Sequence, residues 1–240
     1  MAVDDRWRGA RPRLQVSTWR GRDEVAVLSP MPDRPGPGPD AIRAQLDRLT
    51  ARGVRLVLTG ALHQGELGPF LAAGFAEHER LRLLRHDLRD LPDGDPAVRL
   101  RRAWRRDHDP VLDIDGRAFD AFWALDRRGL DDAVRATPSS RFRLAVERQG
   151  PVVGYAVTGR ASDRGYLQRL AVDPDQHRQG LGSALVADSL RWLRRNGARV
   201  AVVNTQEHNH GAFALYRANG FVPEPQGLTV LVRDIAAPSS

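Results

Sequence analysis

The feature that most constrains this chain is the segment 167–193, in which an apolar strand passes through a loop with two glycines into a helix. The apolar run Leu167–Val172 predicts a strand, and it ends just before Pro174. Gly180 and Gly182 follow in a polar loop, after which apolar residues recur at helical spacing. The segment therefore predicts a strand, a glycine loop and a helix N-terminus in that order.

Such a loop is suited to binding an anion. The first amides of a helix have no intrahelical partners and lie at the positive end of the helix dipole. Glycines let the backbone approach a ligand closely and turn its N–H groups inward, so a phosphate is the natural ligand. For this segment alone, an ordinary strand-to-helix turn with solvated polar residues remains the alternative interpretation.

A second informative segment lies downstream of the glycine loop. Residues 201–204 predict a strand, and after it comes the run 209–221, with the sequence NHGAFALYRANGF. Ala212 and Tyr216 fall on one face of the predicted helix, and Gly220 supplies its C-terminal stop. A short helix is therefore expected to present a tyrosine beside the first helix.

Together the two segments resemble the GNAT superfamily of acetyl-CoA-dependent N-acetyltransferases. The cofactor motif of that family, Gln/Arg-x-x-Gly-x-Gly/Ala, matches at both glycines but has His177 in place of the usual Arg or Gln. The later family motif, Asn-x-x-Ala-x-x-x-Tyr-x-x-x-Gly-Phe, matches at Asn209, Ala212, Tyr216, Gly220 and Phe221. The resemblance covers roughly residues 97 to 235. It implies an α/β (α+β) GNAT fold, with a mixed, mostly antiparallel sheet flanked by helices.

The resemblance also implies roles for individual residues in a direct transfer of acetyl from acetyl-CoA to an amine. Backbone groups at the end of the strand would hold the pantetheine arm, the loop amides the pyrophosphate, and an asparagine the cofactor arm. The implied cofactor-binding residues are Leu170, Ala171, Val172, His177, Arg178, Gln179, Gly180, Leu181, Gly182, Ser183 and Asn209. Tyr216 would be the general acid, a phenol of pKa near ~10 protonating a thiolate of conjugate-acid pKa near ~8.5. A core tyrosine with a satisfied hydroxyl is the alternative for Tyr216.

The acceptor side is less determined by the sequence. Gln168 stands where a base carboxylate could lie, which leaves Glu147, Glu207, His208 or a water as candidates for the base. The candidates for the acceptor site are Phe119, Phe122, Trp123 and Gln168, with Asp120 and Asp126 beside the aromatic residues. Ordinary core aromatic residues with solvated aspartates are the alternative. A weak or absent base favours amines of low pKa, such as α-amines.

Composition narrows the remaining classes. The chain has no cysteine, which excludes a cysteine acyl-enzyme and fits a cytoplasmic setting. All 37 basic residues are arginine, and the net charge of +7 comes without a nucleic-acid recognition motif, so no nucleic acid is expected as partner. No apolar run approaches the ~20 residues of a membrane helix, so no membrane partner is expected either. His208 and His210 lack a third ligand at suitable spacing, so no metal is expected. A homodimer is one of the oligomeric states left open.

The segments before residue 96 repeat the order of the C-terminal half. Strands are expected at 14–19 and 24–28, a helix at about 40–52, a strand at 54–58, a short helix near 69–73 and a strand at 81–84. The interval from Pro30 to Gly53 (53 − 30 = 23) equals that from Pro174 to Gly197 (197 − 174 = 23), an offset of 144. We therefore expect a smaller, degenerate GNAT-like α/β half-domain at residues 1–95 and a catalytic domain at 96–240.

The N-terminal copy lacks chemical groups that the C-terminal copy has at the corresponding positions. Pro35, Pro37 and Pro39 occupy the places of loop residues, and proline has no N–H to donate to an anion. An offset of 146 places Phe70 on Tyr216, so the copy lacks the tyrosine hydroxyl. It is expected to bind no cofactor; an unrelated α/β block that shares only the period is the alternative.

The second domain is expected to begin with a strand at 98–103 and helices at about 109–122 and 130–136. A hairpin of strands at 141–147 and 152–159 and a strand at 166–172 follow. Two functions stay open for it. One is an acetyl-CoA-dependent N-acetyltransferase acting on a small-molecule or protein amine. The other is a non-catalytic acyl-CoA-binding or regulatory module that kept the fold.

Overall fold

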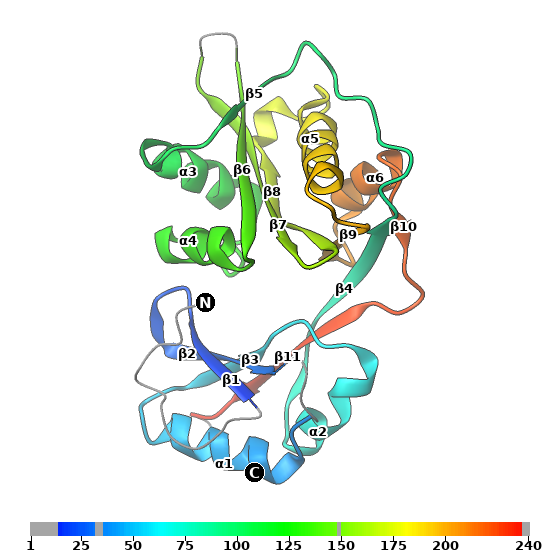
Figure 1. Cartoon of the computed structure of the whole chain (residues 1–240). Coiled ribbons are helices and arrows are strands. Elements are labelled where there is room, and N and C mark those ends of the chain that lie inside the picture. The colour runs from blue at the N-terminus through cyan, green and yellow to red at the C-terminus, as the bar shows by residue number, and fades with distance from the viewer. Residues whose placement is uncertain (1–13, 32–35, 148–149, 237–240) are drawn as a thin grey trace. The chain divides into compact units, whose positions relative to one another are not determined.

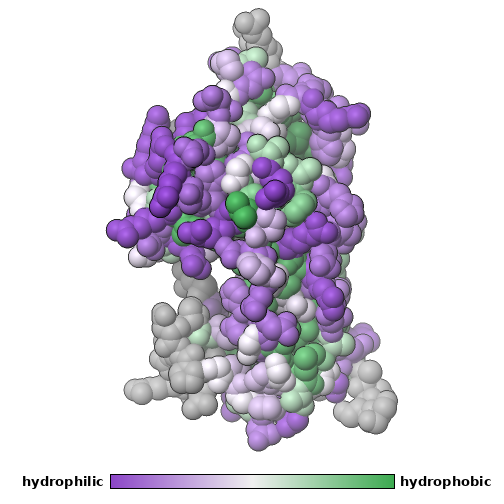
Figure 2. All heavy atoms as spheres, turned by 90° about the vertical axis from the view of Figure 1, so that its right-hand side faces the viewer, coloured by the Kyte–Doolittle hydropathy of each residue, from purple (hydrophilic) through white to green (hydrophobic). Residues whose placement is uncertain are grey.

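The structure is a computed structural model that describes residues 14–31, 36–147 and 150–236 (Figure 1). The described chain forms two compact units, one made of residues 84–224 and the other of residues 14–83 with 225–236. Most apolar side chains lie inside these units. Hydrophilic residues cover most of the face shown in Figure 2, with hydrophobic residues in smaller areas between them.

The larger unit is built on a sheet whose strands follow one another mostly antiparallel. Strands β5 (Arg99–Arg102), β6 (Ser139–Val146), β7 (Val152–Ala161) and β8 (Arg164–Val172) pair in that order, each antiparallel to the next. Strand β9 (Val200–Gln206) then pairs parallel to β8. The remaining elements of this unit are α3 (His108–Ala118), α4 (Arg127–Arg135), α5 (Leu181–Arg195), α6 (His210–Ala218) and the short β10 (Val222–Pro223).

Helices cover both faces of this sheet (Figure 1), and α3 and α4 lie on the face opposite to α5. The reason is the alternation of side chains along β7, which is buried on both faces. Tyr155 and Val157 belong to the core cluster under α3 and α4, whereas Ala156 packs with Leu185 of α5. The expected strands, hairpin and glycine-loop helix of this unit are thus confirmed, and the expected fold class with them.

Helix α3 ends earlier than the sequence pattern predicts. The apolar spacing extends to Phe122, but the helix stops at Ala118 because Phe119 takes an extended backbone conformation. The residues between α3 and α4, 119–126, therefore form a loop, which we call the α3–α4 loop. Asp126 closes it by accepting a hydrogen bond from the Gly129 amide as the N-cap of α4, at 2.6 Å.

The smaller unit has the same element order as the second half of the larger one. Strands β1 (Leu14–Trp19) and β2 (Arg22–Pro30) form a hairpin, α1 (Pro39–Thr50) follows, and β3 (Leu56–Thr59) pairs parallel to β2. Helix α2 (Leu67–Ala72) and strand β4 (Ala76–His86) then complete the N-terminal part. The core includes Ile42, Leu46 and Leu49 of α1, Phe70 of α2, and Phe75 directly before β4.

The last strand of the chain belongs to this smaller unit. Strand β11 (Leu228–Asp234) pairs antiparallel with both β3 and β4, with Leu231 in the core. The units therefore differ from the expected division at residue 95: residues 84–95 lie in the larger unit and 225–236 in the smaller. Pairing between strands far apart in sequence leaves no local signal, so the periodicity could not show this exchange.

Among the described residues, no helix has both the length and the hydrophobicity that a membrane-spanning segment needs.

Candidate functional site

The site is organised by the divergence of two parallel strands. Strand β8 pairs with β9 only from Arg164 to Tyr166, although it stays paired with β7 as far as Val172. The register between β7 and β8 shifts at Gln168, because Val157 faces Arg169 while Thr158 faces Leu167. Along 167–172, the backbone groups of β8 that point away from β7 therefore meet no paired strand within the described chain. Such an edge can pair with an extended ligand.

The loop that follows β8 bends its backbone into left-handed conformations. Arg178 has φ +62° and Gly180 has φ +74°, and Gly180 is the N-cap of α5. The His177 ring closes the loop onto the strand, with Nε2 3.1 Å from the Val172 carbonyl oxygen. The amides at the start of α5 have no intrahelical acceptors, so the loop forms a concave group of donors suited to a phosphate. A Cβ added at Gly180 would lie in ordinary contact with the Asp95 carboxylate, at 3.6 Å, so a side chain there would meet no clash.

Helix α6 is held against the start of α5 by two contacts. A Cβ on Gly182 would come within 3.1 Å of a Leu215 methyl group, so the glycine allows the two helices to approach closely. The buried Asn219 donates from Nδ2 to the Ser183 hydroxyl at 3.1 Å and to the Leu215 carbonyl at 2.8 Å. The sequence identified Asn219 only as part of a helix stop. The structure shows that it links the tyrosine helix to the glycine loop.

Tyr216 lies in an apolar cluster and is only 6% exposed. Its ring packs 5.6 Å from that of Phe221, and its hydroxyl makes no hydrogen bond to any of the described residues. Burial raises the pKa of Tyr216 to about 12, and the positive charge of Arg169 acts in the opposite direction. The expected value near ~10 is therefore too low, because the sequence does not show how deeply the phenol is buried.

Asn209 holds the N-terminus of the same helix. Its Oδ1 accepts a hydrogen bond from the Ala212 amide at 2.9 Å, which makes it the N-cap of α6. The side chain thus has a structural role, and it also lines a pocket of about 430 Å³.

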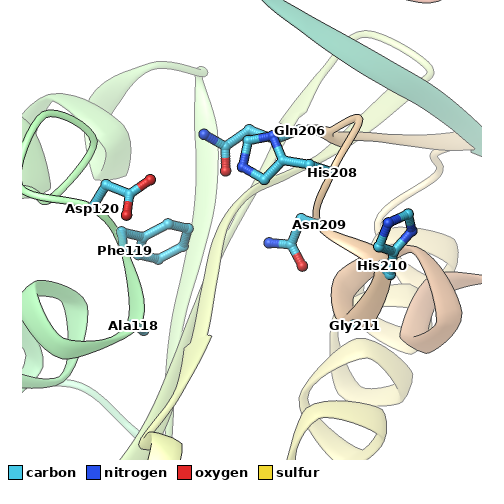
Figure 3. Close-up of a pocket in the computed structure, with 8 residues that line it drawn as sticks. All are labelled: Ala118, Phe119, Asp120, Gln206, His208, Asn209, His210 and Gly211. Atoms are coloured by element: carbon cyan, nitrogen blue, oxygen red, sulfur yellow. The ribbon is translucent and has the colours of Figure 1, made fainter.

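This pocket lies between the end of α3 and the connection from β9 to α6 (Figure 3). Phe119 and Asp120 point into it from the α3–α4 loop, and Asn209 from the opposite side. Its polar groups are one carboxylate, two imidazoles and two amides. The complete lining is Ala118, Phe119, Asp120, Gln206, His208, Asn209, His210 and Gly211. Among the base candidates, His208 is part of the lining; Glu147 and Glu207 are not.

Three of the four expected acceptor residues lie outside this lining. Phe122 and Trp123 pack against each other at 5.2 Å in an edge-to-face arrangement. Gln168 turns toward Gly159 of β7, and its Oε1 is buried without a hydrogen-bond partner. Among the described residues, no three side chains of metal-binding type come together.

The sequence reasoning missed a buried ion pair beside the pocket. Asp115 of α3 is fully buried and accepts two hydrogen bonds from Arg169 of β8. The Arg169 guanidinium lies 3.4 Å from the centre of the Phe119 ring. Two features of the sequence could have indicated it: an arginine within the apolar run 167–172, and an acidic residue at Asp115 within an amphipathic helix.

The comparisons with known proteins agree with this geometry. The mycothiol acetyltransferase of Saccharomonospora viridis is 33% identical over 150 residues, which are 55% of this chain and 47% of that protein. That of Actinosynnema mirum is 31% identical over 212 residues, 82% of this chain and 71% of that protein. The [ribosomal protein bS18]-alanine N-acetyltransferase of Escherichia coli is 35% identical over 74 residues, 31% of this chain and 50% of that protein. The chain thus spans about half the length of the first of these relatives.

Among solved structures, a tandem GNAT protein from the clavulanic acid biosynthesis pathway superimposes with a TM-score of 0.71 at 17% identity. The superposition covers 95% of this chain and 79% of that one. A tandem arrangement agrees with the GNAT-like half-copy that the repeated element order indicates. The acetyltransferase (GNAT) family model matches residues 96–221, more than half of the chain, and the chain therefore belongs to the GNAT family of acetyltransferases.

Proposed function

We propose that the larger unit binds acetyl-CoA and transfers its acetyl group to an amine. The observation that carries this proposal is the open edge of β8, which leads directly into the left-handed loop at the start of α5. An extended arm that ends in a pyrophosphate needs such a combination of strand edge and anion-binding loop. When bound there, acetyl-CoA supplies an acetyl group activated as a thioester.

The chain's own residues fit this ligand. The backbone groups of β8 within 170–172 that point away from β7 are proposed to hold the arm, and the amides from Arg178 to Ser183 to bind the pyrophosphate. Gly180 is needed for its positive φ, which an L-residue rarely adopts. The His177 ring, in the place of the family's Arg or Gln, closes the loop and leaves the binding to backbone amides.

Tyr216 is the proposed proton donor at the leaving sulfur. With a pKa of about 12 the phenol is fully protonated at neutral pH. Complete transfer of its proton to a thiolate of pKa near ~8.5 costs about 5 kcal/mol. We therefore assign most of its effect to a hydrogen bond from the hydroxyl that strengthens as negative charge develops on sulfur.

The pocket lined by Asp120 and His208 is the proposed acceptor site. The carboxylate attracts a cationic amine, and the imidazole is the base candidate within the pocket, so it can accept the proton that the amine must lose before attack. By their names, the relatives act on mycothiol and on an alanine of a ribosomal protein. Both a small molecule and a protein therefore remain within the proposal.

The smaller unit is proposed to be non-catalytic. Its strands β2 and β3 stay paired as far as Leu28 and Thr59, close to the loop. At the offset of 144 this β2 segment corresponds to the open edge of β8, so the slot for an extended arm is closed. Gly36, which the same offset places on Gly180, does not have a positive φ, and Phe70 replaces the tyrosine. Pro35 lies outside the described residues.

Calorimetric titration of acetyl-CoA into the purified chain tests the proposal, followed by a screen of amines in which released CoA thiol is measured with Ellman's reagent. The chain has no cysteine, so the protein itself gives no background. We expect one site per chain and thiol release that depends on the amine. One site without any transfer would support the non-catalytic acyl-CoA-binding module instead, and absence of binding would refute both.

A further inference from the structure

Arg169 and Asp115 form a buried ion pair beside the pocket. Arg169 donates from Nε to Asp115 Oδ2 at 2.7 Å and from one terminal nitrogen to Oδ1 at 2.8 Å. The Asp115 side chain is fully buried, and that of Arg169 is 14% exposed. The Tyr155 hydroxyl, also buried, donates to the same carboxylate. A buried pair with this bidentate geometry holds its groups in one arrangement.

The ion pair makes hydrogen bonds to the backbone of the α3–α4 loop at two positions. The terminal nitrogen of Arg169 also donates to the Trp123 carbonyl oxygen at 2.7 Å. From the other side, Asp115 Oδ1 accepts the Leu125 amide at 2.5 Å. These bonds supply partners for two backbone groups of a loop that lies outside regular secondary structure.

The same guanidinium forms the back of the acceptor wall. Its central carbon lies 3.4 Å from the centre of the Phe119 ring, a cation–π contact with a largely desolvated cation. Phe119 and Asp120 are the aromatic and acidic residues that the loop contributes to the pocket (Figure 3). The positions of both therefore depend on where Arg169 holds the loop.

We propose that Arg169, clamped by Asp115 and Tyr155, is a positioning residue that sets the acceptor wall formed by Phe119 and Asp120. The proposal rests on the acceptor site assigned under the proposed function. Arg169 lies on β8 itself, adjacent to the open edge at Leu170, so the clamp places the acceptor wall in register with the cofactor strand. Arg169 touches neither reacting group in this assignment; it acts on the acceptor wall through the loop, and its charge also lowers the pKa of Tyr216 against the effect of burial.

The test separates positioning from a general loss of stability by using neutral pairs. The double variant D115N/R169Q removes both charges together, which avoids leaving one charge buried alone. The matched control is R101Q/D107N, because Arg101 and Asp107 form another bidentate pair, with both bonds at 2.7 Å, between β5 and the turn before α3. That pair does not contact the α3–α4 loop.

Four quantities are measured for each protein: the KM and the kcat for the acceptor amine, the Kd of acetyl-CoA by calorimetry, and hydrogen exchange of the amides in 119–126. In D115N/R169Q we expect the acceptor KM to rise on the order of tenfold, the Kd of acetyl-CoA to stay within about twofold, and exchange of the Leu125 amide to accelerate. The control is expected to change none of these. An unchanged acceptor KM, or equal effects in the control, would overturn the proposal.

A second variant keeps the test decisive if the double variant does not fold. Arg169→Lys keeps the charge but cannot reach Asp115 and the Trp123 carbonyl together, so the same rise in acceptor KM is expected. If the wild type binds acetyl-CoA and transfers to no amine, the proposed function fails. Hydrogen exchange of the loop then decides the positioning separately: faster exchange in the variants supports it, and unchanged exchange refutes it.

Discussion

Replacing Gly180 with alanine tests whether the shape of the glycine loop is needed for cofactor binding. Gly180 has φ +74°, which costs an L-residue about 1–2 kcal/mol. The nearest atom to an added Cβ is the Asp95 carboxylate at 3.6 Å, an ordinary contact, so the substitution adds backbone strain and no clash. The whole effect therefore comes from the backbone conformation that the loop requires.

The strain can appear in one of two measurements. If the loop keeps its conformation, the variant loses about 1–2 kcal/mol in the free energy of unfolding. If the loop relaxes, its amides turn away from the pyrophosphate, and the same energy appears as a Kd for CoA that is roughly 5- to 30-fold weaker. The two losses together are expected to approach the same total.

Gly197, at the end of α5, provides the matched control. Its φ is +84° and no atom lies within 4 Å of an added Cβ, so Gly197→Ala carries similar strain away from the loop. It is expected to lower the free energy of unfolding in urea by a similar amount and to leave the calorimetric Kd for CoA unchanged. A Gly180→Ala variant with wild-type stability and wild-type CoA affinity would refute the reasoning, as would a loss of CoA affinity in the control.

Three further predictions concern the tyrosine, the N-terminal loop and a buried histidine. Tyr216→Phe should lower kcat by about 10²-fold or more with little change in acetyl-CoA affinity, whereas Tyr166→Phe should leave steady-state kinetics unchanged; equal turnover in both would remove the donor role. Gly38→Ala, at φ −76°, should leave CoA titration unchanged, and a binding defect would contradict the non-catalytic reading of the smaller unit. Burial lowers the pKa of His86 below its usual 6.5, so acid protonates the unfolded state first. Stability should therefore fall as pH drops below about 6.5, by up to about 1.4 kcal/mol per pH unit, until the folded pKa is reached. Urea unfolding of His86→Gln should lack that part of the loss, and an identical pH dependence would reject the assignment.

Prediction from the sequence was most accurate for helices, strands and turns whose conformation depends mainly on the residues within them. The strand, glycine loop and helix from Leu167 onward, and the helix that carries Tyr216, lie where the pattern places them. The half-copy was predicted in element order because its helices and strands repeat the same spacing. These features depend on local periodicity and on glycines that permit positive φ.

Of the residues expected at the acceptor site, only part lie together in the pocket proposed for it. Phe119 lines that pocket, whereas Phe122 and Trp123 pack on each other and Gln168 turns toward Gly159. The helix pattern continues past Ala118, so it could not show that the backbone leaves the helix there. The loop that follows is held by the ion pair of Arg169 and Asp115. These residues lie 54 positions apart in the sequence, so no local pattern records their contact.

The sequence by itself thus determined the family, the glycine loop and the repeated order of elements, because short segments with their own periodicity and turn residues encode them. Tertiary structure alone decided three other things: where β8 and β9 part, which unit takes the last strand β11, and where the Asp115–Arg169 pair holds the α3–α4 loop. Each of these depends on pairing or packing between segments distant in the chain. Such contacts are selected by the burial and hydrogen bonding of the whole fold, which no local pattern records.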